Sequence, residues 1–154
     1  LLKYKVGIGG FLNTKNVYIQ DFQHFNGNQA VAASEYVNSF QLSKYYEHST
    51  TESFYSIAHL EHHFNGLLTN KIPFFKKLNW NLVAGGNTFY VTSKNNYVEV
   101  FAGLENILKI FRVDVIASFE NGSHGHTGIR IGTGGLLGGN IQRGRRGGGT
   151  SINL

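Results

Sequence analysis

The sequence predicts an all-β fold of antiparallel strands that curl into a barrel. Its 154 residues include 20 glycines, and 14% are aromatic while only 15% are charged. This composition fits neither a disordered chain nor a helical bundle. Apolar and polar residues alternate in several segments, which is the two-residue period of a strand with two unlike faces. Short polar stretches separate these segments, as hairpin turns require.

The clearest strands are the neighbouring segments 97–108 and 111–119. In both segments, apolar side chains such as Val98 and Val113 occupy every second position, and polar or charged side chains lie between them. Each strand therefore has one apolar and one polar face. The polar face is predicted to carry Glu99, Glu105, Arg112 and Asp114.

The remaining elements follow from residue types along the chain. The other predicted strands are residues 4–12, 38–48, 52–67, 80–92 and 127–133, and the second and third of these form a hairpin. Residues 13–37 are too long for a hairpin loop and too aromatic for a linker, which predicts an inserted element. Residues 69–79 carry the only proline and have helical spacing, which predicts a short helical connector. Residues 1–135 thus form the barrel strands with these two elements, and residues 136–154 form a glycine-rich tail or a closing half-strand.

Composition and motifs exclude several classes of function. The chain has no cysteine, which removes disulfides, thiol catalysis and thiolate zinc sites. Its net charge of +5 includes three arginines in the glycine-rich tail. That tail lacks the repeated aromatic-flanked units of an RNA-binding segment, so no nucleic-acid partner is expected. No apolar run reaches the length of a membrane-spanning helix. Neither a nucleophile elbow nor a phosphate loop is present, so we expect no enzyme activity, no catalytic residue and no cofactor.

The densest group of metal-ligating residue types is His59, Glu61 and His63. In an extended strand these side chains point to one face, about 7 Å apart at successive steps. The spacing differs from the helical His-Glu-x-x-His pattern of zinc peptidases. Hydrogen bonding across strands is therefore the favoured interpretation, and a metal-dependent enzyme at these residues is a lesser hypothesis.

Alternation alone leaves the orientation of the barrel open. In a soluble barrel the apolar face points inward and binds an apolar small molecule. In a membrane barrel the apolar face meets lipid, and the charged face lines the lumen. Both architectures give the same sequence pattern.

Six phrases carry a family resemblance. They are Gly9-Gly10-Phe11-Leu12, Asp21-Phe22-Gln23-His24-Phe25-Asn26-Gly27-Asn28-Gln29, Glu61-His62-His63-Phe64-Asn65-Gly66, Asn70-Lys71-Ile72-Pro73, Gly103-Leu104-Glu105-Asn106-Ile107 and Phe111-Arg112-Val113-Asp114. On these phrases, nearly all of residues 4–135 resembles the carboxy-terminal part of a family of Gram-negative outer-membrane proteins. Members of that family carry an amino-terminal carboxypeptidase-regulatory-like domain and a carboxy-terminal barrel similar to the surface antigen, or Omp85-like, barrels.

The resemblance implies an antiparallel transmembrane β-barrel to which this chain supplies the carboxy-terminal strands. The implied role is non-enzymatic, in transport or assembly in the cell envelope or as a subunit of an envelope complex. The implied partners are outer-membrane lipid and either other envelope proteins or the amino-terminal part of the same protein. The implied location is the outer membrane of a Gram-negative bacterium.

Under this interpretation the polar face is the lumen face. It carries Glu99, Glu105, Arg112 and Asp114 together with the residue 59–63 cluster. Aromatic residues near strand ends are predicted to form interfacial girdles, namely Trp80, Tyr90, Tyr97 and Phe119. Counting strands back from a periplasmic carboxyl end places residues 120–126 outside, and residues 69–79 and 13–37 inside.

Overall fold

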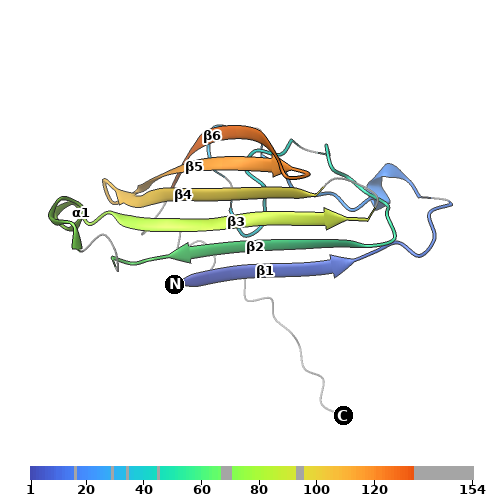
Figure 1. The fold of residues 1–154 in the computed structure, drawn as a ribbon, viewed down its shortest axis with the longest axis horizontal. Coiled ribbons are helices and arrows are strands. Elements are labelled where there is room, and N and C mark those ends of the chain that lie inside the picture. The colour runs from blue at the N-terminus through green and yellow to red at the C-terminus, as the bar shows by residue number, and fades with distance from the viewer. Residues whose placement is uncertain are drawn as a thin grey trace, which may run out of the picture.

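Six strands form one antiparallel sheet in the computed structural model, which describes residues 1–15, 17–28, 30–33, 35–44, 46–66, 71–92 and 96–133. The strands are β1 (Leu2–Gly9), β2 (Tyr55–His63), β3 (Asn81–Val91), β4 (Tyr97–Ile107), β5 (Phe111–Glu120) and β6 (Ser123–Thr133). Each strand pairs with the next one along the chain, so the sheet is a meander (Figure 1). The prediction of an all-β antiparallel fold is confirmed.

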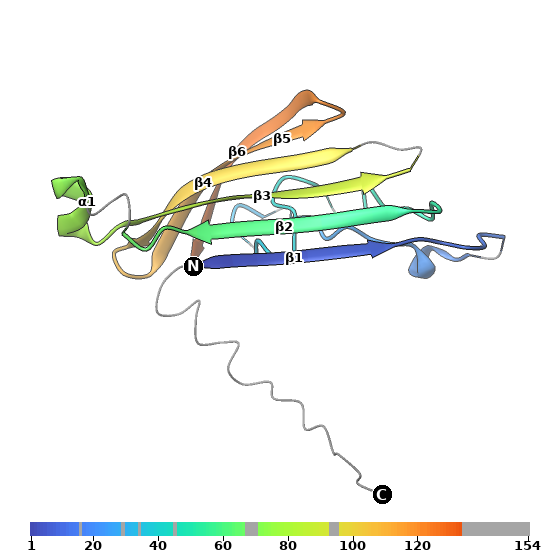
Figure 2. The same cartoon turned by 60° about the horizontal axis from the view of Figure 1, so that its bottom comes forward.

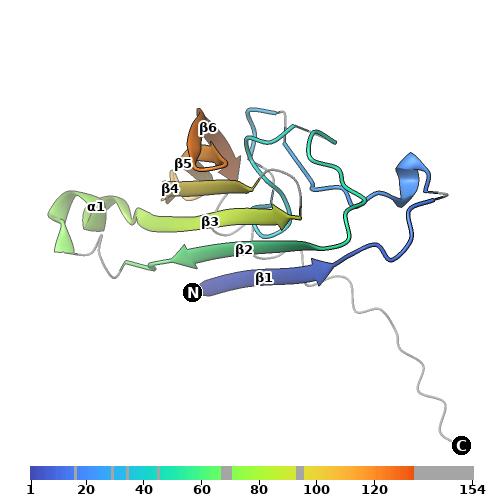
Figure 3. The same ribbon diagram turned by 45° about the vertical axis from the view of Figure 1, so that its right-hand side comes forward.

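The sheet is open at both edges. β1 and β6 lie at its two ends and do not pair with each other, so the described strands are not closed into a barrel. The sheet is nevertheless bent, because β5 and β6 turn away from the plane of β1, β2 and β3 (Figures 2 and 3). The face that carries Glu99 and Arg112 is called the inner face below, and the opposite surface is called the outer face.

The helical content is small. Helix α1 (Pro73–Leu78) lies in the connection between β2 and β3, inside the range 69–79 that was predicted as a helical connector. A single 3-10 turn covers Ile19–Asp21. Among the residues that the structure describes, no helix is long and apolar enough to cross a bilayer.

The prediction of a strand at residues 38–48 is wrong. The described residues of this range form turns and bends, and they belong to one long connection, residues 10–54, between β1 and β2. The inserted element is therefore longer than the predicted residues 13–37. The physical reason is that the backbone N–H groups of Gln41 and Leu42 donate to the Glu99 carboxylate rather than to a neighbouring strand.

Because residues 38–48 are not a strand, the insertion lies at a different end of the sheet from the one predicted. The connection 10–54 leaves the sheet at the same end as the β3–β4 and β5–β6 turns (Figure 1). Helix α1 and the β4–β5 turn lie at the opposite end. The prediction that residues 13–37 share a side with residues 69–79 is wrong. Successive connections of a meander lie at opposite ends of the sheet, so removing the predicted strand 38–48 moves the insertion to the other end.

The β5–β6 hairpin is tighter than the polar loop predicted at residues 120–126. Asn121 and Gly122 have positive φ angles of 50° and 79°, and two successive left-handed residues are what a type I′ hairpin turn needs. Pairing resumes at once, with Ser123 opposite Glu120. The last strand therefore begins at Ser123 rather than at residue 127.

The apolar core lies between the inner face and the 10–54 connection. One cluster joins Phe25 and Phe40 of the connection to Phe89, Val91 and Tyr97 of the sheet, and a second joins Tyr36 to Val83, Phe101 and Ile116. The rings of Phe25 and Phe89 stack with centroids 4.2 Å apart. An irregular segment therefore takes the place of a second layer over this face.

Candidate functional site

The two faces of the sheet differ in charge. By strand register, every Lys, Arg, Asp and Glu residue of the six strands occupies the inner face. These residues are Lys3, Lys5, Glu61, Glu99, Glu105, Arg112, Asp114, Glu120 and Arg130. The outer face of the strands consequently carries no Lys, Arg, Asp or Glu residue.

The outer face is apolar and exposed. Its exposed large side chains are Leu2, Tyr4, Val6, Ile8, Leu60, Tyr90, Val98, Val100, Phe111, Val115, Ile129 and Ile131. Register places these residues in cross-strand rows with half-buried apolar side chains, and one row runs from Leu104 through Val113 to the exposed Ile131. Ile8 is 75% exposed and Val115 is 53% exposed. Soluble monomers rarely expose contiguous apolar patches of this kind.

The 10–54 connection covers the inner face from β2 to β6. At β2, the ring of Phe40 lies 5.1 Å from that of His59. At β6, Arg130 Nε donates to the carbonyl oxygen of Gln41 at 3.0 Å, and the N–H of Ala33 donates to the carbonyl oxygen of Ile131 at 2.8 Å. The polar centre of the inner face is therefore covered by the chain's own connection, while Lys3 and Lys5 of β1 stay exposed.

Glu99 is the main anchor of this cover. Its carboxylate is completely buried and accepts hydrogen bonds from three successive backbone N–H groups, those of Gln41 at 2.8 Å, Leu42 at 2.7 Å and Ser43 at 3.3 Å. The Tyr97 hydroxyl donates to the same carboxylate at 2.7 Å. All of these partners are neutral donors, and hydrogen bonds to an ionised acceptor are about twice as strong as neutral ones.

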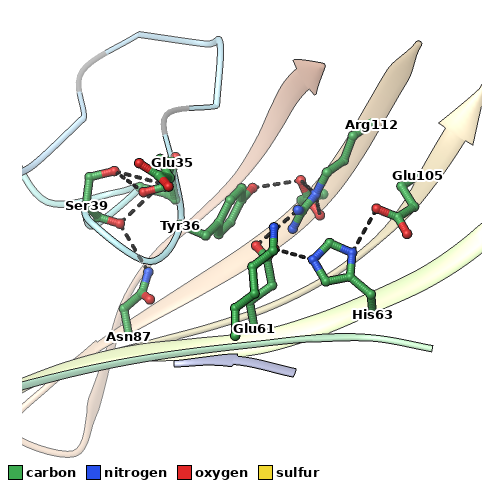
Figure 4. Close-up of polar contacts among 11 residues, drawn as sticks. Glu35, Tyr36, Ser39, Glu61, His63, Asn87, Glu105 and Arg112 are labelled. Atoms are coloured by element: carbon green, nitrogen blue, oxygen red, sulfur yellow. Dashed lines mark hydrogen bonds and ion pairs between the residues drawn. The ribbon is translucent and has the colours of Figure 1, made fainter. Parts of the chain in front are cut away.

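A second buried network links three strands through ionic contacts (Figure 4). Glu61 of β2 contacts His63 Nε2 and accepts from Arg112 Nη1 at 3.1 Å. His63 Nδ1 lies 2.9 Å from Glu105 of β4. Arg112 Nε donates to Asp114, at 2.8 Å to the nearer oxygen. The network therefore crosses the sheet from β2 to β5.

The contacts of His63 define its protonation. Each of its two ring nitrogens faces a carboxylate oxygen, and an ionised carboxylate only accepts hydrogen bonds. Both nitrogens therefore donate, which requires the imidazolium form. Lys3 Nζ also lies 3.5 Å from Glu61. In formal charges, Lys3, His63 and Arg112 balance Glu61, Glu105 and Asp114.

Tyr36 closes the network from the covering segment. Its hydroxyl donates to Asp114 at 2.7 Å, and its ring lies 4.3 Å from the Arg112 guanidinium carbon. Burial, reinforced by the negative charge of Asp114, raises the pKa of Tyr36 above its usual range. The hydroxyl therefore stays protonated and keeps donating. Arg112 Nη2 is buried without a hydrogen-bond partner among the described residues.

The structure brings the predicted polar residues together on one face. Glu105, Arg112 and Asp114 share the ionic network, whereas Glu99 lies in the separate hydrogen-bonded anchor. All four are buried, and the 10–54 connection contacts Glu99, Arg112 and Asp114 directly, whereas the sequence placed all four against an aqueous lumen. The difference arises because alternation reports which residues share a face and not what covers that face.

The histidine cluster is divided between two environments. His59 Nδ1 lies 2.9 Å from the side-chain oxygen of Asn87, and the His59 ring packs against Phe40. Glu61 and His63 belong to the ionic network instead. Within the described ranges, no group of three His, Cys, Asp or Glu side chains is arranged to hold a metal ion.

Not all of the predicted girdle residues point outward. Tyr90 is 46% exposed on the outer face, as a girdle residue would be. Tyr97 is buried on the inner face, where it packs against Phe89 and donates to Glu99. The prediction for Tyr97 is wrong, because this residue has the same strand parity as Glu99.

The residues of the connection that complete the site do not follow from the strand pattern. Tyr36, Phe40 and the backbone of residues 41–43 lie far in sequence from the strands they contact. The available signal was the aromatic content of the insertion, since aromatic residues dominate buried surfaces.

Comparison with known proteins identifies the family. Residues 1–104 match the family described as "Family of unknown function (DUF5686) C-terminal domain". The chain belongs to this family. The matched range covers β1 to β3 and most of β4, together with the covering connection, while Arg112 and Asp114 lie beyond it. No curated protein and no solved structure matches the chain.

Proposed function

We propose that the chain is a non-enzymatic segment of an outer-membrane β-barrel, with its outer face in lipid and its inner face enclosed. The observation that carries this proposal is the separation of charge between the faces. The outer face has exposed apolar rows and no Lys, Arg, Asp or Glu, while the inner face holds all the strand charges. Transmembrane barrels have this arrangement of apolar exterior and polar interior.

The size of the exposed apolar face supports the proposal. Complete burial of one large apolar side chain contributes about 1.5–3 kcal/mol, so twelve that are roughly half exposed leave on the order of 10 kcal/mol unused in water. That is comparable with the entire stability of a domain, about 5–15 kcal/mol. A lipid environment supplies this burial without any further protein.

Strand length and sheet edges agree with the same proposal. β3, β4 and β6 each have 11 residues, and β5 has 10, which matches the 9–11 residues or so of a membrane-spanning strand. Six strands whose edge strands, β1 and β6, do not pair with each other are fewer than the smallest outer-membrane barrels use. We therefore propose that the chain joins further strands in a larger, Omp85-like barrel that serves envelope transport, assembly or a membrane protein complex.

The soluble alternative requires the opposite orientation. A soluble barrel that binds an apolar small molecule needs its apolar rows inside, yet Val98 and Val100 are exposed and Glu99 is buried between them. The observed orientation therefore favours the membrane proposal.

Cysteine scanning tests the proposal, because the chain has no cysteine of its own. Val100→Cys and Val115→Cys are placed on the outer face of the protein in bilayers, and Asn121→Cys in the exposed β5–β6 turn is the control. We expect the two outer-face cysteines to resist a water-soluble maleimide, and a probe attached to them to be quenched by nitroxide lipids. The turn cysteine is expected to label rapidly. Equal aqueous labelling at all three positions would refute the proposal.

A further inference from the structure

The two ends of the sheet carry different charges. At the α1 end, the β2–β3 connection (residues 64–80) and the end of β4 with the β4–β5 turn (residues 106–110) contain four lysines and no aspartate or glutamate. The connections at the other end, residues 10–54, 92–96 and 121–122, contain three lysines and four acidic residues. The α1 end is therefore a cationic pole beside the apolar outer face.

The four lysines of this pole are Lys71, Lys76, Lys77 and Lys109, and all are exposed. The two connections that carry them are joined, because Asn106 Nδ2 donates to the carbonyl oxygen of Asn79 at 2.8 Å. In the described part of the chain none of the four lysines forms an ion pair. The positive charges are therefore available to an external anion.

Exposed apolar residues accompany these lysines. Ile72, which precedes helix α1, is 48% exposed, and Leu78, the last residue of the helix, is 41% exposed. Leu108, beside Lys109, is 78% exposed. Phe111, the first residue of β5, continues this apolar surface onto the outer face. Cationic groups beside an apolar band match a bilayer interface, where phosphates lie directly above the hydrocarbon.

We infer that this pole, defined as Lys71, Lys76, Lys77 and Lys109 with their apolar neighbours, binds the phosphate groups of anionic phospholipid headgroups. The inference rests on the proposed membrane location and adds to it a lipid partner and a fixed orientation. Each lysine at an anionic surface contributes about 1 kcal/mol, which corresponds to about a fivefold change in affinity. The opposite end has no such excess of positive charge.

The test compares lipid preference in two double variants of the full protein. Lys76→Gln with Lys77→Gln removes charge from the pole, and Lys15→Gln with Lys44→Gln removes the same charge from exposed positions at the other end. Association of a fluorescent phosphatidylglycerol with detergent-solubilised protein is measured against phosphatidylcholine. We expect the pole variant to lose affinity for phosphatidylglycerol by about 25-fold, and the control variant by less than about twofold. Added salt should weaken binding to the unmodified protein.

Several outcomes separate this inference from the proposed function. Insertion into neutral vesicles, measured by flotation and resistance to alkaline extraction, tests the membrane location alone. Insertion without any preference for phosphatidylglycerol, or with equal losses in both variants, would overturn the inference and leave the proposed function standing. Salt-dependent binding without insertion would overturn the proposed function and retain the cationic pole. A second pair, Lys71→Gln with Lys109→Gln, must reproduce the loss if the whole pole is used.

Discussion

Glu99→Gln is expected to release the covering segment from the sheet. The substitution keeps the size of the side chain and removes its charge. The carboxylate accepts from the N–H groups of Gln41, Leu42 and Ser43, whereas an amide has a single accepting oxygen. If that oxygen faces Leu42 and Ser43, the amide NH₂ meets the N–H of Gln41, and two donors oppose each other.

The magnitude follows from these contacts. Hydrogen bonds to a charged group contribute about 1.5–3 kcal/mol each and neutral ones about 0.5–1.5 kcal/mol, so weakening three bonds costs roughly 3 kcal/mol. The unpaired N–H of Gln41 adds about 1–3 kcal/mol, and relief from burying a charge offsets about the same amount. A net cost of about 3 kcal/mol corresponds to a rise of roughly 150-fold in the open population.

Amide hydrogen exchange measures this opening directly. Protection of the Leu42 and Ser43 amides should fall by about two orders of magnitude in Glu99→Gln, because exchange reports local opening free energy. Glu47→Gln changes an exposed carboxylate of the same segment and should alter protection by less than about threefold. Unchanged protection in Glu99→Gln, or an equal loss throughout β4, would refute the anchoring role.

Three further substitutions test the ionic network. Arg112→Met leaves Asp114 buried without its cation and removes one of the three cationic partners of Glu61. It should lower the free energy of unfolding by about 3–5 kcal/mol in denaturant titration, and a loss under about 1 kcal/mol would contradict this. Tyr36→Phe removes the hydroxyl that donates to Asp114 and should lower the free energy of unfolding by about 1–2 kcal/mol in the same titration. An unchanged denaturation midpoint would count against this contact. Gly103→Ala drives a methyl group into the Asp114 carboxylate and should lower the thermal midpoint through a cost of about 1–3 kcal/mol, which a neutral result would disprove.

The strands were predictable because two different demands act on alternate residues. Along β4 and β5 the outer-face side chains are apolar and the charged side chains lie on the inner face, so residues 97–107 and 111–120 show a two-residue period. The same argument failed at residues 38–48, where Ser39, Gln41 and Ser43 alternate with apolar neighbours as a strand would. There the backbone donors bind one carboxylate instead of a ladder, and local alternation does not reveal such a distant acceptor.

The site was predictable in its members and not in its surroundings. Period-two spacing correctly places Glu99, Arg112 and Asp114 on a single face, but whether water or protein covers that face depends on contacts between distant residues. The separation of His59 from the ionic network likewise depends on Asn87, a residue on the neighbouring strand. Pairing across strands sets each histidine's role, and spacing within one strand does not.

The two margins of the sheet are unequally available for extension. At β6 the backbone of Ile131 is already engaged, since it accepts from Ala33 and donates to Val31, so a strand added there must displace this short parallel bridge. At β1 the outward amides have no competing partner in the described structure. An additional strand can therefore pair more easily with β1 than with β6, because at β1 it does not have to displace existing backbone hydrogen bonds.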